Sequence, residues 1–218
     1  MKKKLSKKIK NFVIFGSGDN AKIIFWQIYK RKDINFIGFV DNKKKIGTTI
    51  IKYKKKSYKV VSNEKKINKN YYGIISVLEP KIRKKIFKSI CSFCKNFKWL
   101  KIVSDTAIIS QNSYVGNGTF LGPGSIVNSN TKIGANCFIN TGSIIEHDCI
   151  IGSFTHVCPG AVIAGGVSIG SGCLIGSNST ILPGINIGNN VKIGAGSVIL
   201  KDIPDNATVV GNPGKTII

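Results

Sequence analysis

The sequence is poor in acidic residues, arginine and long apolar runs. Of its 218 residues, 33 are basic and 10 are acidic, for a net charge of +23, yet only two of the basic residues are arginine. Base readout and stacking favour arginine, so we expect no nucleic-acid partner. No apolar run approaches the roughly 20 residues of a membrane span, and the apolar segment after the first lysines is too short for a signal peptide. We therefore expect a cytoplasmic protein.

Histidine and paired cysteine motifs are also scarce. The chain has two histidines, His147 and His156, and six cysteines. Cys91 and Cys94 form a single C-x-x-C pair, with no second pair to complete a four-ligand zinc site. The sequence therefore predicts no metal cofactor, and we expect most of the cysteines to be small buried residues.

Charge and glycine content change together near residue 101. Residues 1–101 contain 29 basic and five acidic residues, whereas residues 102–218 contain four basic and five acidic ones. Glycine follows the opposite trend, with five before residue 102 and nineteen after it. Two composition changes at one place predict a domain boundary, so we divide the chain into residues 1–101 and 102–218.

The second part of the chain repeats every six residues. From Val103 to Ile199, each of seventeen successive sixth positions is Ile, Val or Leu, without an insertion. A period of six fits neither a helix nor an alternating strand. It fits a parallel β-helix, in which each hexapeptide forms one short strand and one turn and three hexapeptides complete a triangular coil. A sandwich of irregular strands, the alternative fold, would not keep this period over ninety-seven residues.

The first part of the chain predicts a small Rossmann-like α/β unit. A buried strand at 11–15 precedes the turn Gly16-Ser17-Gly18-Asp19-Asn20-Ala21, a helix, and a strand at 35–40 that ends in Asp41-Asn42. A third strand is expected at 72–78 and a helix at 81–99. This order is typical of a nucleotide-binding unit, with a phosphate at the helix N-terminus and a sugar hydroxyl at the acid. A tight turn without a ligand is the alternative. The small size favours a mononucleotide-linked ligand over NAD.

The pattern (Ile/Leu/Val)-Gly-x-x-small-x and the tail from Ile203 to Lys215 resemble the left-handed β-helix of the hexapeptide-repeat acyltransferases. With the Rossmann-like part, the chain resembles the bacterial nucleotide-sugar acetyltransferases. These N-acetylate UDP-4-amino-4,6-dideoxy sugars or GDP-perosamine, and sialic-acid O-acetyltransferases are related to them. The resemblance implies acetyl-CoA as co-substrate, a nucleotide-linked amino sugar as substrate, and a homotrimer with sites between adjacent β-helices. Asp19, Asn42 and Gly214 depart from the family, which usually has His, a second acid and Ala there.

The candidate catalytic residues are His147 and its two neighbours, Glu146 and Asp148, in a domain with few charges. A carboxylate that binds one ring nitrogen fixes the tautomer and raises the basicity of the other nitrogen, as a general base requires. An idle surface histidine is the alternative. The resemblance implies that His147 is the base, that Asp148 tunes it, and that the amine attacks the thioester directly.

His156 follows nine residues later, which is half of an eighteen-residue coil. We therefore expect the two histidines to project from opposite sides of one subunit and to approach each other only across a subunit boundary. The resemblance implies that His156 and the Gly165 backbone contact the acetyl thioester and that Ser177 and Ala195 line the pantetheine path. The residues expected to bind the nucleotide sugar are Ser17, Gly18, Asp19, Asp41, Asn42 and Asn140.

Other activities remain open at this point. The γ-class carbonic anhydrases share the β-helix, but they need three histidine ligands per zinc ion, which two histidines do not supply. O-acetylation of a sialic-acid-like sugar is the alternative reaction. A non-catalytic β-helix that binds carbohydrate or assembles is the alternative of another class.

Overall fold

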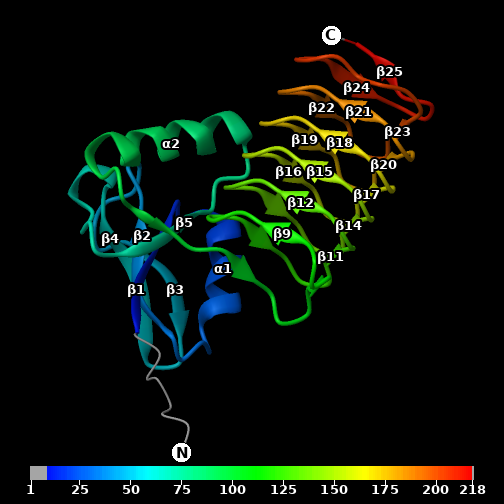
Figure 1. The fold of residues 1–218 in the computed structure, drawn as a ribbon. Helices are drawn as coiled ribbons and strands as arrows, with labels where there is room; N and C mark the ends of the chain where they lie inside the picture. The colour runs from blue at the N-terminus through cyan, green and yellow to red at the C-terminus, as the bar shows by residue number, and fades with distance from the viewer. Residues whose placement is uncertain (1–8, 218) are drawn as a thin grey trace, which may run out of the picture. The chain divides into compact units, whose positions relative to one another are not determined.

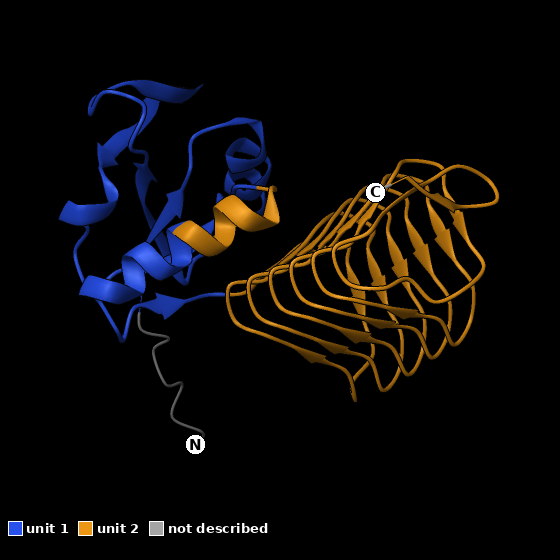
Figure 2. Cartoon of the chain, turned by 90° about the horizontal axis from the view of Figure 1, so that it is seen from above, with its two compact units in different colours: residues 1–77, 86–100 blue, residues 78–85, 101–218 orange. Residues whose placement is uncertain are grey.

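The computed structural model describes residues 9–217, which divide into two compact units. The first unit comprises residues up to 77 and residues 86–100, and the second comprises residues 78–85 and those from 101 onwards (Figure 2). Helix α2 (Pro80–Phe93) therefore contributes residues to both units. None of the helices in residues 9–217 has the length and hydropathy of a membrane span.

The first unit is built on a six-stranded sheet of order β3-β4-β2-β1-β5-β6 (Figure 1). Its elements are β1 (Lys10–Phe15), α1 (Asp19–Ile28), β2 (Ile34–Val40), β3 (Thr49–Tyr53), β4 (Lys56–Ser62), a 3₁₀ helix (Glu64–Lys66), β5 (Tyr72–Ile75) and β6 (Lys98–Trp99). Strands β4, β2, β1, β5 and β6 are parallel, and β3 pairs with β4 as an antiparallel hairpin. The expected order of strand, glycine-rich turn, helix and strand is confirmed.

Three features of this unit differ from the prediction. The helix expected at 81–99 ends at Phe93, and residues 98–99 form the edge strand β6 instead. The Trp99 ring packs against Phe15, with ring centroids 5.6 Å apart, so core packing places this segment on the sheet. Strand β5 ends at Ile75 rather than at residue 78. The β3–β4 hairpin was not predicted, because its lysine-rich sequence hides the apolar alternation of a strand.

The second unit contains a parallel β-helix of two-residue strands. Between residues 102 and 199, seventeen strands take turns in three sheets, so each strand pairs with the one eighteen residues later. Face 1 holds β7 (Ile102–Val103), β10 (Phe120–Leu121), β13 (Phe138–Ile139), β16 (His156–Val157), β19 (Leu174–Ile175) and β22 (Lys192–Ile193). Face 2 holds β8 (Ile108–Ile109), β11 (Ile126–Val127), β14 (Ile144–Ile145), β17 (Val162–Ile163), β20 (Thr180–Ile181) and β23 (Val198–Ile199). Face 3 holds β9 (Tyr114–Val115), β12 (Lys132–Ile133), β15 (Ile150–Ile151), β18 (Ser168–Ile169) and β21 (Asn186–Ile187).

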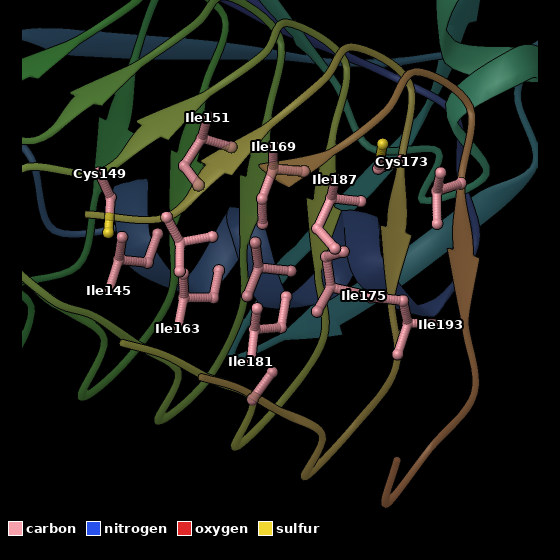
Figure 3. Packing of buried hydrophobic residues seen from close by; sticks show 14 of the residues in the cluster. Ile145, Cys149, Ile151, Ile163, Ile169, Cys173, Ile175, Ile181, Ile187 and Ile193 are labelled. Atoms are coloured by element: carbon pink, nitrogen blue, oxygen red, sulfur yellow. The ribbon is translucent and has the colours of Figure 1, made fainter. Parts of the chain in front are cut away.

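The aliphatic residue of each hexapeptide fills the interior of the coils (Figure 3). From Val115 to Ile199, every such residue is at most 4% exposed. Cys137, Cys149 and Cys173 lie two positions before an aliphatic residue and are fully buried, as expected of small core residues. The predicted fold class, a Rossmann-like α/β domain followed by a left-handed parallel β-helix, is confirmed.

The buried Arg83 joins the start of helix α2 to the β-helix within the second unit. Its guanidinium donates to the carbonyl oxygens of Asn136 (2.8 Å), Phe154 (2.6 Å) and Leu78 (2.7 Å). Its planar group also lies 5.2 Å from the ring centroid of Phe138, on the outer side of face 1. A buried cation must be compensated by acceptors and π-systems, and these contacts supply them.

The C-terminal tail closes the last coil. Ile203 forms a parallel bridge with Ile187, and β24 (Thr208–Val210) extends face 1 by pairing with β22. Strand β25 (Lys215–Thr216) then pairs with β24 in the antiparallel sense. Ile203 and Val209 are at most 5% exposed. The tail therefore covers apolar residues that an open coil would expose to water.

The two isoleucines of β15 provide a test of where the stability of the β-helix arises. Ile151 is inside the coil and 1% exposed, whereas Ile150 is outside and 53% exposed. Truncation Ile151→Ala leaves a cavity that the stacked coils cannot fill, so we expect a loss of about 2–5 kcal/mol in the free energy of unfolding. Ile150→Ala should cost about 0.5 kcal/mol or less. Urea unfolding followed by far-ultraviolet circular dichroism measures both, and equal losses would contradict the inner column as the main source of stability.

Candidate active site

His147 lies at the turn between β14 of face 2 and β15 of face 3. Its side chain is 59% exposed, and its Nδ1 is 2.8 Å from Oδ2 of Asp148. Asp148 has a φ of +59°, a left-handed conformation that aspartate tolerates better than most residues. A carboxylate only accepts hydrogen bonds, so Nδ1 donates its proton to Asp148. The lone pair of Nε2 is then free to accept a proton from a substrate.

Asp148 is held as a carboxylate by two hydrogen-bond donors. The bond from His147, and then the bond from Asn130, lower the pKa of Asp148. Nδ2 of Asn130 is 3.0 Å from Oδ1 of Asp148. Each oxygen of the carboxylate therefore has a different partner, and the group is ionised at neutral pH.

The other predicted carboxylate, Glu146, is engaged by a different residue. Its Oε2 accepts from Nδ2 of Asn128 at 2.9 Å. Neither Asn128 nor Asn130 was identified from the sequence, although each precedes its partner by one coil of eighteen residues. The coil period, applied to the surface positions as well as to the core, would have found both asparagines. A catalytic role of Glu146 stays a prediction.

Gly165 lies directly against the ring of His147 on the next coil. A Cβ atom at Gly165 would lie 2.7 Å from both Cε1 and Nε2 of His147. Any larger residue would therefore displace the imidazole from this position. The structure thus brings together three of the predicted residues, Asp148, His147 and Gly165, with Nε2 beside the backbone of Gly165.

His156 projects from face 1, whereas His147 lies at the corner between faces 2 and 3. His156 lies on the outer side of face 1, but its exposure is 4%. Its Nε2 is 3.4 Å from Nδ2 of Asn140, its Nδ1 is 3.8 Å from Sγ of Cys158, and its ring packs edge-on to Phe138. Burial, and then the positive charge of Arg83, lower the pKa of His156 to about 3. His156 is therefore a neutral, enclosed imidazole, and its contact with a thioester stays a prediction.

The predicted site residues of the β-helix form two groups. His147, Asp148 and Gly165 lie at the border between faces 2 and 3. Asn140, Ser177 and Ala195 follow the face 1 strands β13, β19 and β22, at the border between faces 1 and 2. The two groups therefore flank face 2 on its two sides.

In the first unit, Asp41 is hydrogen-bonded to the predicted nucleotide-binding turn. Oγ of Ser17 donates to Oδ2 of Asp41 at 2.5 Å, and the backbone N–H groups of Lys43 and Lys44 donate to Oδ1. Burial acts to raise the pKa of Asp41, but these hydrogen bonds, with the charge of Lys44, leave it lowered. Nζ of Lys44 donates to the carbonyl oxygen of Ser17 at 3.0 Å. The structure therefore places a cation at the glycine-rich turn.

The N-terminus of α1 lacks a side-chain cap. Gly18 is its N-cap residue and has no side chain that could cap the helix, although its carbonyl oxygen accepts from the N–H of Ala21 at 3.1 Å. The N–H groups of Asp19 and Asn20 therefore have no partner within the helix. Asp19 is exposed and pairs with Lys22 at 2.9 Å. The side chain of Asn42 accepts from the backbone N–H of Glu64 at 3.1 Å, so it anchors the 3₁₀ helix.

Within residues 9–217, no group of three His, Cys, Asp or Glu side chains is arranged to hold a metal ion. All six cysteines are free thiols. Burial raises the pKa of Cys158 and, with smaller opposing contributions from hydrogen bonds, that of Cys173 to about 11. These thiols stay protonated at neutral pH and are poor nucleophiles.

Models of known protein families match segments in both parts of the chain. The family described as the PglD N-terminal domain matches residues 11–90. The bacterial transferase hexapeptide family matches residues 112–147 and 130–165, and the hexapeptide repeat of succinyl-transferase matches residues 166–201. A search of curated protein sequences found no match to the chain.

Several solved structures share the fold of the whole chain. The acetyltransferase domain of PglB from Neisseria gonorrhoeae is 24% identical, with a TM-score of 0.87, and the match covers 95% of this chain and 100% of that one. PerB from Caulobacter crescentus, solved with CoA and GDP-perosamine, is 25% identical, with a TM-score of 0.82 and coverage of 97% and 99%. WeeI from Acinetobacter baumannii is 24% identical, with a TM-score of 0.79 and coverage of 95% and 100%. These matches confirm the fold that the sequence motifs indicate.

His156 should titrate very differently from a histidine in water, because it is buried beside a guanidinium. The unfolded chain protonates His156 below pH 6.5, whereas the folded chain does so only near its lowered pKa of about 3. Between these values the unfolded state binds one more proton, so the free energy of unfolding falls by about 1.4 kcal/mol for each unit that the pH is lowered. Above pH 6.5, His156 is neutral in both states, and its burial no longer makes the free energy of unfolding depend on pH.

Proton NMR of the imidazole Cε1–H signals tests this difference, with His147→Asn used to assign the two signals. We expect the His156 signal to stay at its neutral position from pH 8 to pH 4.5. A His156 midpoint near 6 in the folded protein would contradict its enclosure.

Proposed function

We propose that this protein, a hexapeptide-repeat acetyltransferase with a PglD-type N-terminal domain, acetylates the amino group of a nucleotide-linked sugar. The donor is acetyl-CoA, and the acceptor is a UDP- or GDP-linked 4-amino-4,6-dideoxy sugar. The observation that carries this proposal is the His147–Asp148 pair, which presents a free Nε2 against the backbone of Gly165. The likeness to PerB, solved with CoA and GDP-perosamine, supports this choice of substrates.

The reaction that this geometry supports is direct attack. The neutral amine of the sugar attacks the thioester carbonyl, and the developing ammonium loses its proton to Nε2 of His147. The ionised Asp148 stabilises the imidazolium that forms. The N–H group of Gly165 is the candidate donor to the oxyanion. The tetrahedral intermediate then collapses with cleavage of the C–S bond, and the CoA sulfur leaves with a proton from the imidazolium.

The N-terminal unit would hold the nucleotide part of the acceptor. Open N–H groups at the start of α1 and the Nζ of Lys44 form a positively charged environment at the glycine-rich turn. Such an environment suits the diphosphate of a nucleotide sugar. Asp41 is already bound to Ser17 and two backbone N–H groups, so it also shapes the turn.

A thiol-release assay over a panel of UDP- and GDP-linked amino sugars tests the function. We expect His147→Asn to lower kcat on the best acceptor by about 10²–10⁴-fold, because the variant has no base at this position. The Km for acetyl-CoA should change little. Near wild-type turnover of His147→Asn would refute the mechanism. If only acceptors with a hydroxyl group in place of the amine were turned over, the protein would be an O-acetyltransferase instead.

We propose further that the protein is a homotrimer, with each site formed by two chains. The outer column of face 2 is aliphatic except for one threonine, and each member is partly or fully exposed in the single chain: Ile108, Ile126, Ile144, Val162, Thr180 and Val198. Leu182 and Leu200, in a neighbouring column, are 39% and 54% exposed. A regular apolar surface of this kind is typical of a protein interface. The two groups of predicted site residues border this face, so contacts between faces of neighbouring chains would bring one group against the other.

Two isoleucine-to-lysine variants in equivalent outer positions test the assembly. Ile144 is on face 2, and Ile150 is in the equivalent position on face 3. We expect Ile144→Lys to dissociate the trimer, because the interface would bury an unpaired charge. Ile150→Lys should leave the trimer intact. Sedimentation velocity measures the mass of both variants, and a monomeric wild-type protein, or a trimeric Ile144→Lys, would exclude this interface.

A further inference from the structure

A stack of polar side chains leads along the β-helix to the histidine of the proposed site. Asn112, Asn130 and Asp148 occupy the same turn position on three successive coils, eighteen residues apart. Nδ2 of Asn112 is 2.5 Å from Oδ1 of Asn130, and Nδ2 of Asn130 is 3.0 Å from Oδ1 of Asp148. The remaining oxygen of Asp148 is the one that binds His147. The stack is continuous, and both asparagine bonds are donated toward Asp148, which also accepts from His147.

We propose that Asn130 is a positioning residue for His147, acting through Asp148, and that Asn112 fixes the orientation of the Asn130 amide. The role in catalysis rests on the proposed function, whereas the effect on the imidazole does not. Asn130 does not contact the imidazole, and it acts by holding the group that does.

The direction of the bonds carries the argument. An asparagine side chain has one acceptor oxygen and one donor nitrogen, so a donor at its oxygen leaves the nitrogen for the next partner. Asn112 donates to the Asn130 oxygen, so the Asn130 nitrogen is directed at Asp148. A carboxylate is the only side chain that accepts from both Asn130 and His147 and also supplies a negative charge. The stack therefore ends at an aspartate.

The bond from Asn130 matters because Asp148 is exposed. Its side chain is 56% exposed, so water competes for both oxygens, and rotation of the carboxylate would break its bond to His147. With Oδ1 held by Asn130, Oδ2 stays directed at Nδ1 of the imidazole. The tautomer that leaves Nε2 free is then maintained without a buried contact.

A purely structural role of Asn130 is the competing explanation. Asn130 and Asp148 have φ values of +60° and +59°, and asparagine and aspartate both tolerate this left-handed turn. Asn190 offers a matched control. It occupies the same turn position after β21, has a φ of +55°, and donates to Oδ1 of Asn206 at 3.2 Å, at a place remote from His147 in the coil order.

The decisive variant is Asn130→Asp, with Asn190→Asp as the control for added charge. Aspartate keeps the size and the left-handed turn, but when ionised it cannot donate and it repels Asp148. A second negative charge near the imidazole favours its protonated form. We therefore expect the NMR titration midpoint of His147 to rise by about 0.5–1 pH unit in Asn130→Asp and to stay within about 0.1 unit in Asn190→Asp. The acidic limb of the pH profile of kcat/Km should move upward by the same amount.

A second variant removes the donor without adding charge. Glycine accepts the left-handed turn, so Asn130→Gly keeps the backbone and deletes the bond. We expect kcat to fall about tenfold, with the Km for acetyl-CoA unchanged. An unchanged His147 midpoint in Asn130→Asp, or equal shifts in the two aspartate variants, would overturn the proposal. The NMR titration needs no substrate, so a shifted midpoint in a protein that fails to acetylate amino sugars would refute the proposed function and leave the positioning role standing.

Discussion

The stacking of each residue on its equivalent eighteen positions later is the constraint on which the second unit depends. Parallel pairing of two-residue strands sets this spacing, and the closely packed aliphatic interior does not accept a change of register. The same spacing organises the surface. It places Gly165 under the ring of His147, Asn130 beside Asp148, and Asn128 beside Glu146. The core and the proposed site are therefore two consequences of one repeat.

The repeat also gives two histidines of one sequence opposite properties. His147 follows a strand and sits in a turn, where water and Asp148 surround it. His156 belongs to a strand and lies on face 1, where it contacts Asn140 and Phe138 and feels the charge of Arg83. An exposed imidazole with a carboxylate partner suits proton transfer, whereas a buried imidazole near a guanidinium resists protonation. Position within the hexapeptide therefore decides which histidine is available as a base.

The fold was predictable from the sequence. Aliphatic residues at every sixth position predict the β-helix, and the glycine-rich turn after strand β1 predicts the Rossmann-like unit. The pairing of His147 with Asp148 was predictable as well, since neighbours in a tight turn lie close together. The lowered pKa of His156 was not, because Arg83, whose charge contributes to it, comes from a distant part of the sequence. The end of α2 at Phe93 was also missed, because the packing of Trp99 against Phe15 outweighs helical propensity there. These two features depend on residues distant in sequence, whereas the β3–β4 hairpin was missed for a local reason, its lysine-rich sequence.

The position of the proposed site at a corner of the coils follows from what each part of a coil can offer. Residues inside the coils are packed against their equivalents and cannot reach a substrate. Strand residues on the outer faces project from a regular surface, which suits association with another chain better than it suits chemistry. The turns present exposed polar side chains such as those of His147 and Asp148, and Asp148 has the left-handed φ of such a turn. The stacked coils thus hold the catalytic pair in a fixed geometry. The side chains of the turns can differ without disturbing the coils, which allows the site to be adapted to a substrate.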